Sequence, residues 1–132
     1  MTTSAMREWL VTNKIVDAIL GENAHTEVVK RAGPILKFLI KYGQGAFDAS
    51  CVEVVWKCQM DKHEEMVRIV YNVIQEISPV LPLNLINEFF KRIRQVPQNQ
   101  YDEKFLNFLK ELTSRALESA MMAKRDKIRM QL

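Results

Sequence analysis

The stretch SCVEVVWKCQMDKHEEMVRIVYNVIQEI, residues 50 to 77, decides the fold because it contains two helical patterns joined by a short polar turn. Apolar and sulfur-containing side chains recur every three or four residues in both halves, which is the spacing of one helix face. Val52 and Trp56 add a second apolar ridge to the first half, and a helix with two apolar faces usually lies between neighbouring helices. We therefore expect helices at about 50–59 and 63–77. Their stripes are Cys51, Val54, Val55 and Cys58, and then Met66, Ile69, Val70, Val73, Ile74 and Ile77.

The same helical period runs through the rest of the chain, and no β-strand pattern survives beside it. Helical patterns cover about residues 4–20, 26–42, 82–96 and 102–120. The apolar side chains that carry them are Met6, Trp9 and Leu10; Val28, Val29, Ala32, Ile35, Leu36, Leu39 and Ile40; Leu85, Ile86, Phe89, Phe90 and Ile93; and Phe105, Leu106, Leu109, Leu112, Ala116 and Leu117.

Polar residues mark the expected helix starts. Ser4 can cap the first helix, and Asp102 can cap the last. Ser50 and Glu53 have the spacing of a capping box, in which a hydroxyl and a carboxylate satisfy free amides reciprocally. We expect all three helices to begin at these residues.

Two prolines bear on where helices begin and end. Pro82 suits the first residue of a helix, where its missing amide hydrogen has no intrahelical partner to lose. The Gly33-Pro34 pair instead lies inside the 26–42 pattern, where proline removes a donor and crowds the preceding turn. We expect a kink or a break there.

The helices recur in pairs. The second helix of each pair is expected near residues 26, 63 and 102, and a helix–turn–helix unit with a period of about 40 residues is typical of HEAT and armadillo arrays. The pattern predicts an all-α fold, an α-solenoid of about three stacked helix pairs at 4–42, 48–78 and 82–120, within one domain at 1–120. Residues 121–132 are expected to form a basic, frayed tail. An irregular helical bundle is the alternative.

Composition limits the class of protein. The chain has 132 residues, enough for one domain, and a formal charge of only +3, so we expect no nucleic acid partner. No apolar run reaches the roughly 18 to 20 residues that span a bilayer, and no membrane partner is expected. Two cysteines without a signal-peptide pattern predict free thiols in a reducing compartment, the cytoplasm or the nucleus.

The turn at 58–65 gathers side chains that could form a site: Cys58, Asp61, His63, Glu64 and Glu65. A structural zinc site usually has four ligands in closely spaced pairs, whereas the two cysteines are seven residues apart on an apolar stripe. A nucleophilic cysteine needs an exposed thiolate, a base and an oxyanion hole, and no such context is visible. We predict no catalytic, cofactor-binding or metal-binding residue, and an enzyme that uses Cys58 and His63 is the alternative.

Basic residues alternate with the apolar stripe in the 82–96 pattern. Phe89 and Phe90 fit the core, which leaves Lys91, Arg92 and Arg94 for the solvent side. Together with Arg68, these three residues are the expected contacts with a protein partner.

The order of features resembles a known family. MREWLVTNKIVDAILGENAHTEVVKRAGPILKFLIKYG, a loop, and then VWKCQMDKHEEMVRIVYNVIQEISP together resemble a helical, non-catalytic segment of very large ubiquitin-specific proteases, the group of the FAF-X, twenty-four and thirty-four types. The resemblance covers about residues 6–95, and within the group we expect the twenty-four type. It lies in Glu8-Trp9-Leu10, Asn13, Ile19, Trp56 and Lys62-His63-Glu64.

The resemblance implies a parent protein that is a cysteine-type deubiquitinase, a thiol-dependent ubiquitinyl hydrolase with its catalytic domain outside this chain. The family's catalytic cysteine lies in a box with glycine and asparagine at a helix start, and neither Cys51 nor Cys58 has that context. The chain is therefore expected to be a non-catalytic scaffold that binds protein substrates or regulators, ubiquitinated ones included, without a cofactor. A stand-alone helical adaptor and a basic nucleic-acid-binding domain are the alternatives.

Overall fold

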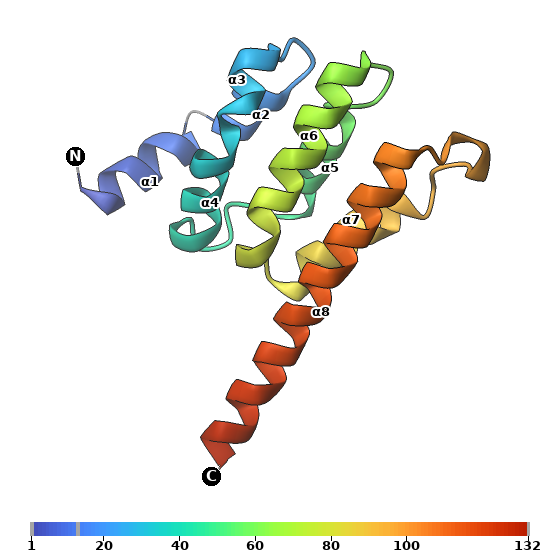
Figure 1. The fold of residues 1–132 in the computed structure, drawn as a ribbon. Helices are drawn as coiled ribbons and strands as arrows, with labels where there is room; N and C mark the ends of the chain where they lie inside the picture. The colour runs from blue at the N-terminus through green and yellow to red at the C-terminus, as the bar shows by residue number, and fades with distance from the viewer. Residues whose placement is uncertain (1, 13, 132) are drawn as a thin grey trace.

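The computed structural model describes residues 2–12 and 14–131, and all regular structure within these ranges is helical, which confirms the all-α class (Figure 1). The α-helices are α1 (Thr3–Thr12), α2 (Ile15–Leu20), α3 (Thr26–Lys30), α4 (Ala32–Tyr42), α5 (Ala49–Lys57), α6 (Glu64–Ile77), α7 (Leu83–Ile93) and α8 (Glu103–Gln131). Two short 3-10 helices, η1 (Ser78–Val80) and η2 (Gln98–Gln100), lie in the segments before and after α7.

The helices stack as successive pairs in two layers. In Figure 1, α4, α6 and α8 lie side by side in one layer, and α2, α5 and α7 lie behind them. The second helices begin at Thr26, Glu64 and Glu103, about 38 residues apart. This arrangement confirms the predicted α-solenoid, because each pair packs mainly against the pair before or after it.

The core runs continuously through all the pairs and is centred on α6. All six residues of the predicted α6 stripe are buried, and Tyr71 is buried with them. The Tyr71 and Phe108 rings stack with their centroids 4.3 Å apart, and the Trp56 ring lies 6.4 Å from that of Phe108. This aromatic cluster joins α5, α6 and α8 at one point.

The Gly33-Pro34 pair coincides with a break between two helices. α3 ends at Lys30 and α4 begins at Ala32, so Gly33 and Pro34 lie in the first turn of α4. Amides in a first turn have no intrahelical acceptor, and the missing N–H of Pro34 therefore costs no helical hydrogen bond. Pro34 is therefore compatible with the helical pattern at 26–42, because a new helix begins at Ala32, two residues before the proline.

Gly33 has a second role in packing. A Cβ at this position would come close to the carboxylate of Glu76, which reaches over from α6. The same carboxylate lies 3.5 Å from Lys37 Nζ one turn further along α4. Without a side chain at Gly33, the Glu76 carboxylate can approach the positive end of α4, where negative charge is favoured.

Two expected helix starts are wrong and one is confirmed. The N-cap of α5 is Asp48, whose side chain accepts hydrogen bonds from the amides of Ser50 and Cys51, and the expected Ser50–Glu53 box does not form. The α1 start is capped by Thr2, whose hydroxyl accepts from the amide of Ala5, in place of Ser4. Asp102 does cap α8, since it accepts from the amide of Phe105 at 2.8 Å.

Pro82 precedes its helix by one residue. It is the N-cap of α7, with extended backbone, and Leu83 is the first helical residue. The expectation that it would be the first residue of the helix is therefore off by one position.

Parts of the expected inward face of α8 are also wrong. Leu106 and Leu117 are 49% and 61% exposed, whereas Phe108, absent from the expected set, is buried. Phe105, Phe108 and Leu112 follow one face, and Leu106 and Leu117 lie on another. Among the other expected stripes, Met6, Trp9 and Val28 are exposed as well.

Residues 121–131 of the expected basic tail form the end of α8, and residue 132 lies outside the described residues. The helix continues to Gln131, and every residue from Met121 to Gln131 is exposed. In Figure 1 this half of α8 extends away from all the other helices.

The aromatic cluster predicts a large difference between two neighbouring positions on α8. Phe108→Ala should lower the free energy of unfolding by about 3–5 kcal/mol, because it leaves a cavity against Trp56 and Tyr71. Leu106→Ala, at an exposed position, should cost less than about 1 kcal/mol. Urea unfolding followed by circular dichroism measures both, and equal losses would contradict the described face of α8.

The Asp48 cap predicts a pH-dependent contribution to stability. Asp48→Ala should cost about 1 kcal/mol at neutral pH, and Asp48→Asn less, because an amide oxygen still caps. The hydrogen bond donated by Ser50 holds the pKa of Asp48 below its usual value. The carboxylate therefore stabilises the fold above the unfolded-state pKa of about 3.9, and this contribution disappears as the pH falls through the lower folded-state pKa.

Unfolding free energies of the parent chain and Asp48→Asn should therefore converge in acid. Asp126→Asn, in the exposed end of α8, is the matched control and should have the unfolding free energy of the parent chain at neutral pH. A difference between the parent chain and Asp48→Asn that grows as the pH falls would refute the cap assignment.

Candidate interaction surface

The polar turn between α5 and α6 combines a buried thiol with an exposed imidazole. Cys58 is buried at the end of α5, and burial raises the pKa of its thiol, with Lys62 opposing this shift. His63 is exposed and serves as the backbone N-cap of α6 without a side-chain capping bond. Because a raised pKa depletes the thiolate, Cys58 lacks the activation that a nucleophile needs.

The second cysteine has a similar environment. Cys51 is half-buried, its Sγ donates to the main-chain oxygen of Ala46 at 3.5 Å, and burial raises the pKa of its thiol. Within residues 2–12 and 14–131, no group of three or more histidine, cysteine, aspartate or glutamate side chains is arranged to hold a metal ion.

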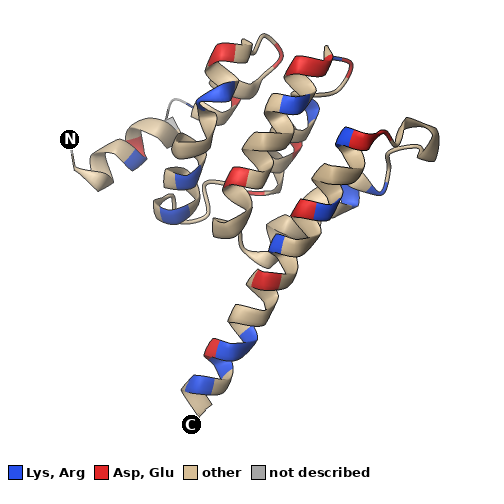
Figure 2. Ribbon diagram, viewed as in Figure 1, with Lys and Arg blue, Asp and Glu red and all other residues tan. Residues whose placement is uncertain are grey.

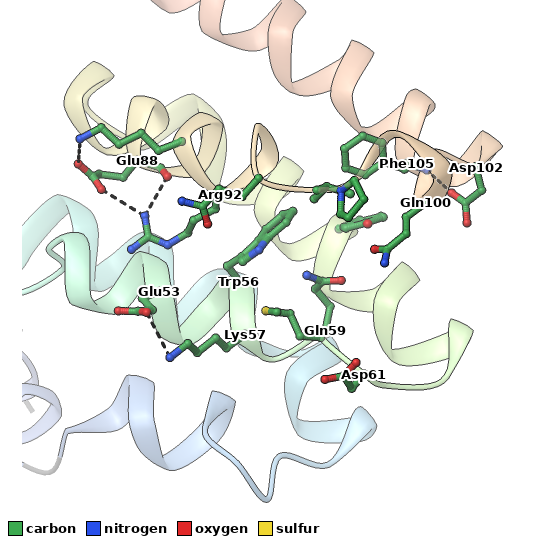
Figure 3. Close-up of a pocket in the computed structure, with 16 residues that line it drawn as sticks. Glu53, Trp56, Lys57, Gln59, Asp61, Glu88, Arg92, Gln100, Asp102 and Phe105 are labelled. Atoms are coloured by element: carbon green, nitrogen blue, oxygen red, sulfur yellow. Dashed lines mark hydrogen bonds and ion pairs between the residues drawn. The ribbon is translucent and has the colours of Figure 1, made fainter.

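An open groove of about 710 Å³ lies between α5, the turn after α5, α7 and the segment that leads from α7 to α8 (Figure 3). Trp56 lies in its centre, and the side-chain amides of Gln59 and Gln100 extend along it (Figure 3). The groove is lined by Glu53, Trp56, Lys57, Gln59, Met60, Asp61, Tyr71, Glu88, Lys91, Arg92, Gln95, Val96, Pro97, Gln100, Asp102 and Phe105.

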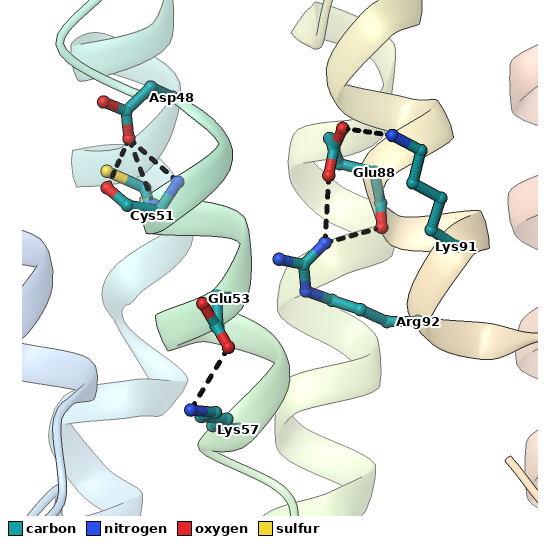
Figure 4. Close-up of polar contacts among 8 residues, drawn as sticks. Asp48, Cys51, Glu53, Lys57, Glu88, Lys91 and Arg92 are labelled. Atoms are coloured by element: carbon teal, nitrogen blue, oxygen red, sulfur yellow. Dashed lines mark hydrogen bonds and ion pairs between the residues drawn. The ribbon is translucent and has the colours of Figure 1, made fainter. Parts of the chain in front are cut away.

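The α7 wall of this groove is an ion-pair network. The Glu88 carboxylate accepts from Lys91 Nζ at 2.9 Å and from Arg92 Nη1 at 3.2 Å (Figure 4). Arg92 Nη1 also donates to the main-chain oxygen of Glu88 at 2.9 Å. The hydrogen bonds from Lys91 and Arg92 hold the pKa of Glu88 below its usual value. These partners are three and four residues apart, so one helical turn creates the network.

The α5 wall repeats this arrangement with a single pair. Glu53 and Lys57 form an ion pair at 3.2 Å across one turn (Figure 4). At the other end, burial raises the pKa of the Tyr71 hydroxyl, and the negative charge of Asp102 adds to this shift. The groove therefore offers amides and paired charges, donors and acceptors that can bind the main chain of an extended polypeptide.

The structure separates the four expected contact residues. Lys91 and Arg92 both line the groove, but only Lys91 is exposed as expected. Arg92 is largely covered, with 19% of its side chain exposed, because Glu88 folds it against α7. Arg94 is exposed and does not line the groove.

Arg68 belongs to a second, smaller hollow on the opposite layer. This hollow of about 220 Å³ lies between α3 and α6 and is lined by Lys30, Arg68, Ile69, Asn72, Val73 and Glu76. Arg68 and Asn72 are exposed there. The four residues thus do not form one surface.

Sequence reasoning missed the amide side chains of the groove. Gln59 follows α5, Gln95 follows α7, and Gln100 ends η2. The segment RQVPQNQ at 94–100 is rich in amides between two helices, and this composition was the available signal. Trp56 was expected only as a core residue, and it is one, but its ring also forms part of the groove.

Comparison with known proteins places this architecture in a family. A sequence model of the UBP24/USP9X/USP9Y ARM repeat matches residues 1–128 of the chain. The chain belongs to this armadillo-repeat family. The match spans all three helix pairs of the armadillo chain, and it confirms the resemblance noted in the sequence.

Curated relatives of the armadillo chain are named as ubiquitin hydrolases. Human ubiquitin carboxyl-terminal hydrolase 34 is 27% identical over 84 residues, which is 62% of the chain and 2% of that protein. Human ubiquitin carboxyl-terminal hydrolase 9Y is 28% identical over 79 residues, 59% of the chain and 3% of that protein. The probable ubiquitin carboxyl-terminal hydrolase FAF of Drosophila melanogaster is 25% identical over the same length. The armadillo chain thus spans a very small part of these relatives.

No solved structure matches the armadillo chain. In the part of the chain that the structure describes, no helix is both long enough and apolar enough to cross a bilayer.

The buried thiols predict slow chemical modification. In a Cys51→Ala variant, Cys58 is the single thiol, and its alkylation by iodoacetamide at neutral pH should be at least about tenfold slower than in the urea-unfolded chain. In the reciprocal Cys58→Ala variant, the half-buried Cys51 should react faster than Cys58. Mass spectrometry over time measures both rates, and a Cys58 that reacts as fast folded as unfolded would contradict its burial.

Proposed function

We propose that the chain is a non-catalytic armadillo scaffold segment of a large cysteine-type deubiquitinase. The observation that carries this proposal is the match of the armadillo-repeat family over residues 1–128, in a chain whose two thiols are both shielded. The named relatives are ubiquitin carboxyl-terminal hydrolases many times longer than the chain. In such a protein the hydrolysis of ubiquitin conjugates would be the task of a separate domain.

The scaffold role would be binding of protein substrates or regulators. The groove between α5 and α7 supports this role, because Gln59, Gln95 and Gln100 bring both donors and acceptors to one open surface. Extended polypeptides bind through main-chain hydrogen bonds, which side-chain amides can satisfy from a fixed position. Lys91 and Arg92 remain the proposed charged contacts in the groove, Arg94 would contact a partner beside it, and Arg68 would contact a partner on the opposite layer.

The charge pattern of the groove favours protein over nucleic acid. Its three cations, Lys57, Lys91 and Arg92, are all paired with Glu53 or Glu88. Phosphate binding would have to break these pairs, whereas nucleic-acid surfaces present unpaired cations to phosphate.

The chain should not hydrolyse ubiquitin derivatives. With ubiquitin linked to a fluorogenic amine, the 132-residue chain should release no fluorophore above the buffer rate, and a Cys58→Ala, His63→Ala double variant should behave identically. Turnover that disappears in the folded double variant would defeat the scaffold proposal.

The binding role needs a test in the longer protein. Charge reversal at Lys91 and Arg94 should reduce cleavage of protein conjugates while leaving cleavage of the fluorogenic substrate unchanged. Lys41→Glu, an exposed reversal on α4, is the matched control. Equal loss on both substrates would indicate damage to catalysis instead of substrate binding.

A further inference from the structure

The groove between α5 and α7 contains polar groups that the described chain leaves available. The side-chain amides of Gln59, Gln95 and Gln100 all line it, and within residues 2–12 and 14–131 none of the three makes a hydrogen bond. Each amide can both donate and accept. The groove therefore offers hydrogen-bonding groups from three separate segments to a partner.

The charges that remain available in the groove are negative. Every cation in the lining is already paired with a glutamate of its own helix. These cations are Lys57, Lys91 and Arg92. Asp61 and Asp102 also line the groove, are exposed, and form no ion pair in the described part of the chain. Lys62 and Arg94, exposed cations close by in the sequence, do not line it.

The two free carboxylates lie toward the same end of the groove, which we call the acidic end. In Figure 3, Asp61 and Asp102 lie on the side of Trp56 where Gln100 is, away from the paired Glu88. In Figure 2, red marks acidic residues in the turn before α6 and at the entry to α8. Asp102 uses one oxygen to accept from the α8 backbone, and its other oxygen is available. A cationic side chain at this end meets carboxylates that are not yet neutralised.

The amides favour an extended polypeptide as the occupant. An extended chain has free main-chain N–H and C=O groups for Gln59, Gln95 and Gln100, whereas a helix bonds these groups internally. A small molecule fits less well, because small-molecule pockets are mostly apolar and enclose most of the ligand. This groove is open, and most of its lining side chains are polar or charged.

A second copy of the chain does not supply such a segment. Its cations lie mostly on helices, and no non-helical stretch within the described residues contains two of them. The free carboxylates also disfavour an acidic segment, because like charges brought together at an interface lower affinity.

We propose that the groove binds an extended basic segment of a partner protein, with lysine or arginine side chains at Asp61 and Asp102 and the main chain along Gln59, Gln95 and Gln100. Arginine suits the acidic end best, since its planar guanidinium matches the geometry of a carboxylate. Lys91 and Arg92 do not oppose such a segment, because Glu88 neutralises them. The inference rests on the proposed scaffold role and names the class of partner that the groove takes.

A designed peptide tests the proposal directly. The probe is fluorescein-labelled Gly-Thr-Arg-Thr-Arg-Thr-Gly with blocked ends. We expect it to bind the 132-residue chain saturably in fluorescence anisotropy, and more weakly as salt is raised. The same peptide with glutamate in place of arginine should bind at least about tenfold more weakly. Methylation of its threonine main-chain amides, which keeps the charge, should weaken binding at least about fivefold.

Paired variants locate the binding to the acidic end. Asp61→Asn and Asp102→Asn should each weaken binding of the arginine peptide about threefold, and the double variant about tenfold. Asparagine tolerates the positive φ at residue 61, and an amide oxygen can still cap α8. Asp126→Asn, exposed on α8 and outside the groove, is the matched control and should bind like the parent chain. Circular dichroism must show the parent fold in all variants.

Tryptophan fluorescence gives a second, local readout. In a Trp9→Phe background, Trp56 is the single tryptophan, and it lies in the groove. Saturation with the unlabelled arginine peptide should shift its emission. An unchanged emission at saturation would place the peptide elsewhere and contradict the inference.

Four further results would overturn the inference. They are no binding of the arginine peptide, equal or tighter binding of the glutamate peptide, binding that both aspartate variants leave unchanged, and self-association in sedimentation that the double variant abolishes. Displacement by spermine, together with full binding of the methylated peptide, would make a small polyamine the ligand instead. None of these readouts involves ubiquitin hydrolysis, so the inference can fail while the scaffold role stands. Turnover of the fluorogenic substrate would defeat the scaffold role and leave peptide binding measurable.

Discussion

The structure depends on the burial of α6 between the helix pair before it and the helix after it. Seven α6 side chains are buried. α6 packs against α3 and α4 of the preceding pair, against α5 of its own pair and against α8 of the following pair. No helix pair of this size can cover its own apolar surface, so the pairs are stable only as a stack. The groove beside Trp56 lies where α5 and α7 pack against each other, next to the segment that leads to α8.

Much of the fold follows from sequence because helical period and burial agree over long segments. The α6 stripe from Met66 to Ile77 was predicted correctly since apolar spacing alone defines that face. The α8 face was partly wrong because each residue turns the helix by about 100°, and a long helix with scattered apolar residues admits more than one stripe. Only the contact with Tyr71 and Trp56 selects Phe108 over Leu106. The choice of Asp48 over Ser50 as a cap likewise depends on where the loop ends.

The candidate surface was harder to predict than the fold. Exposure of Lys91 and Arg94 follows from their position opposite the phenylalanines of α7. Arg92 was also expected on the solvent side of α7, but its guanidinium hydrogen-bonds to Glu88 one turn earlier and is largely covered. Apolar periodicity does not predict such a contact between two polar side chains of one helix. The grouping of Gln59, Gln95 and Gln100 comes from three separate segments, and only the stacked pairs bring such segments together.

The missing side chain at Gly33 has a consequence for the contact between two successive repeats. Glu76 links two successive repeats twice, at the first turn of α4 and at Lys37, and both links depend on the carboxylate lying directly over the glycine. A single methyl group there would push the carboxylate aside and disturb both links together. Because the atoms in the way are the flexible end of the Glu76 side chain, the carboxylate can turn aside, and the contact between the two repeats absorbs the change while the backbone of both helices stays in place.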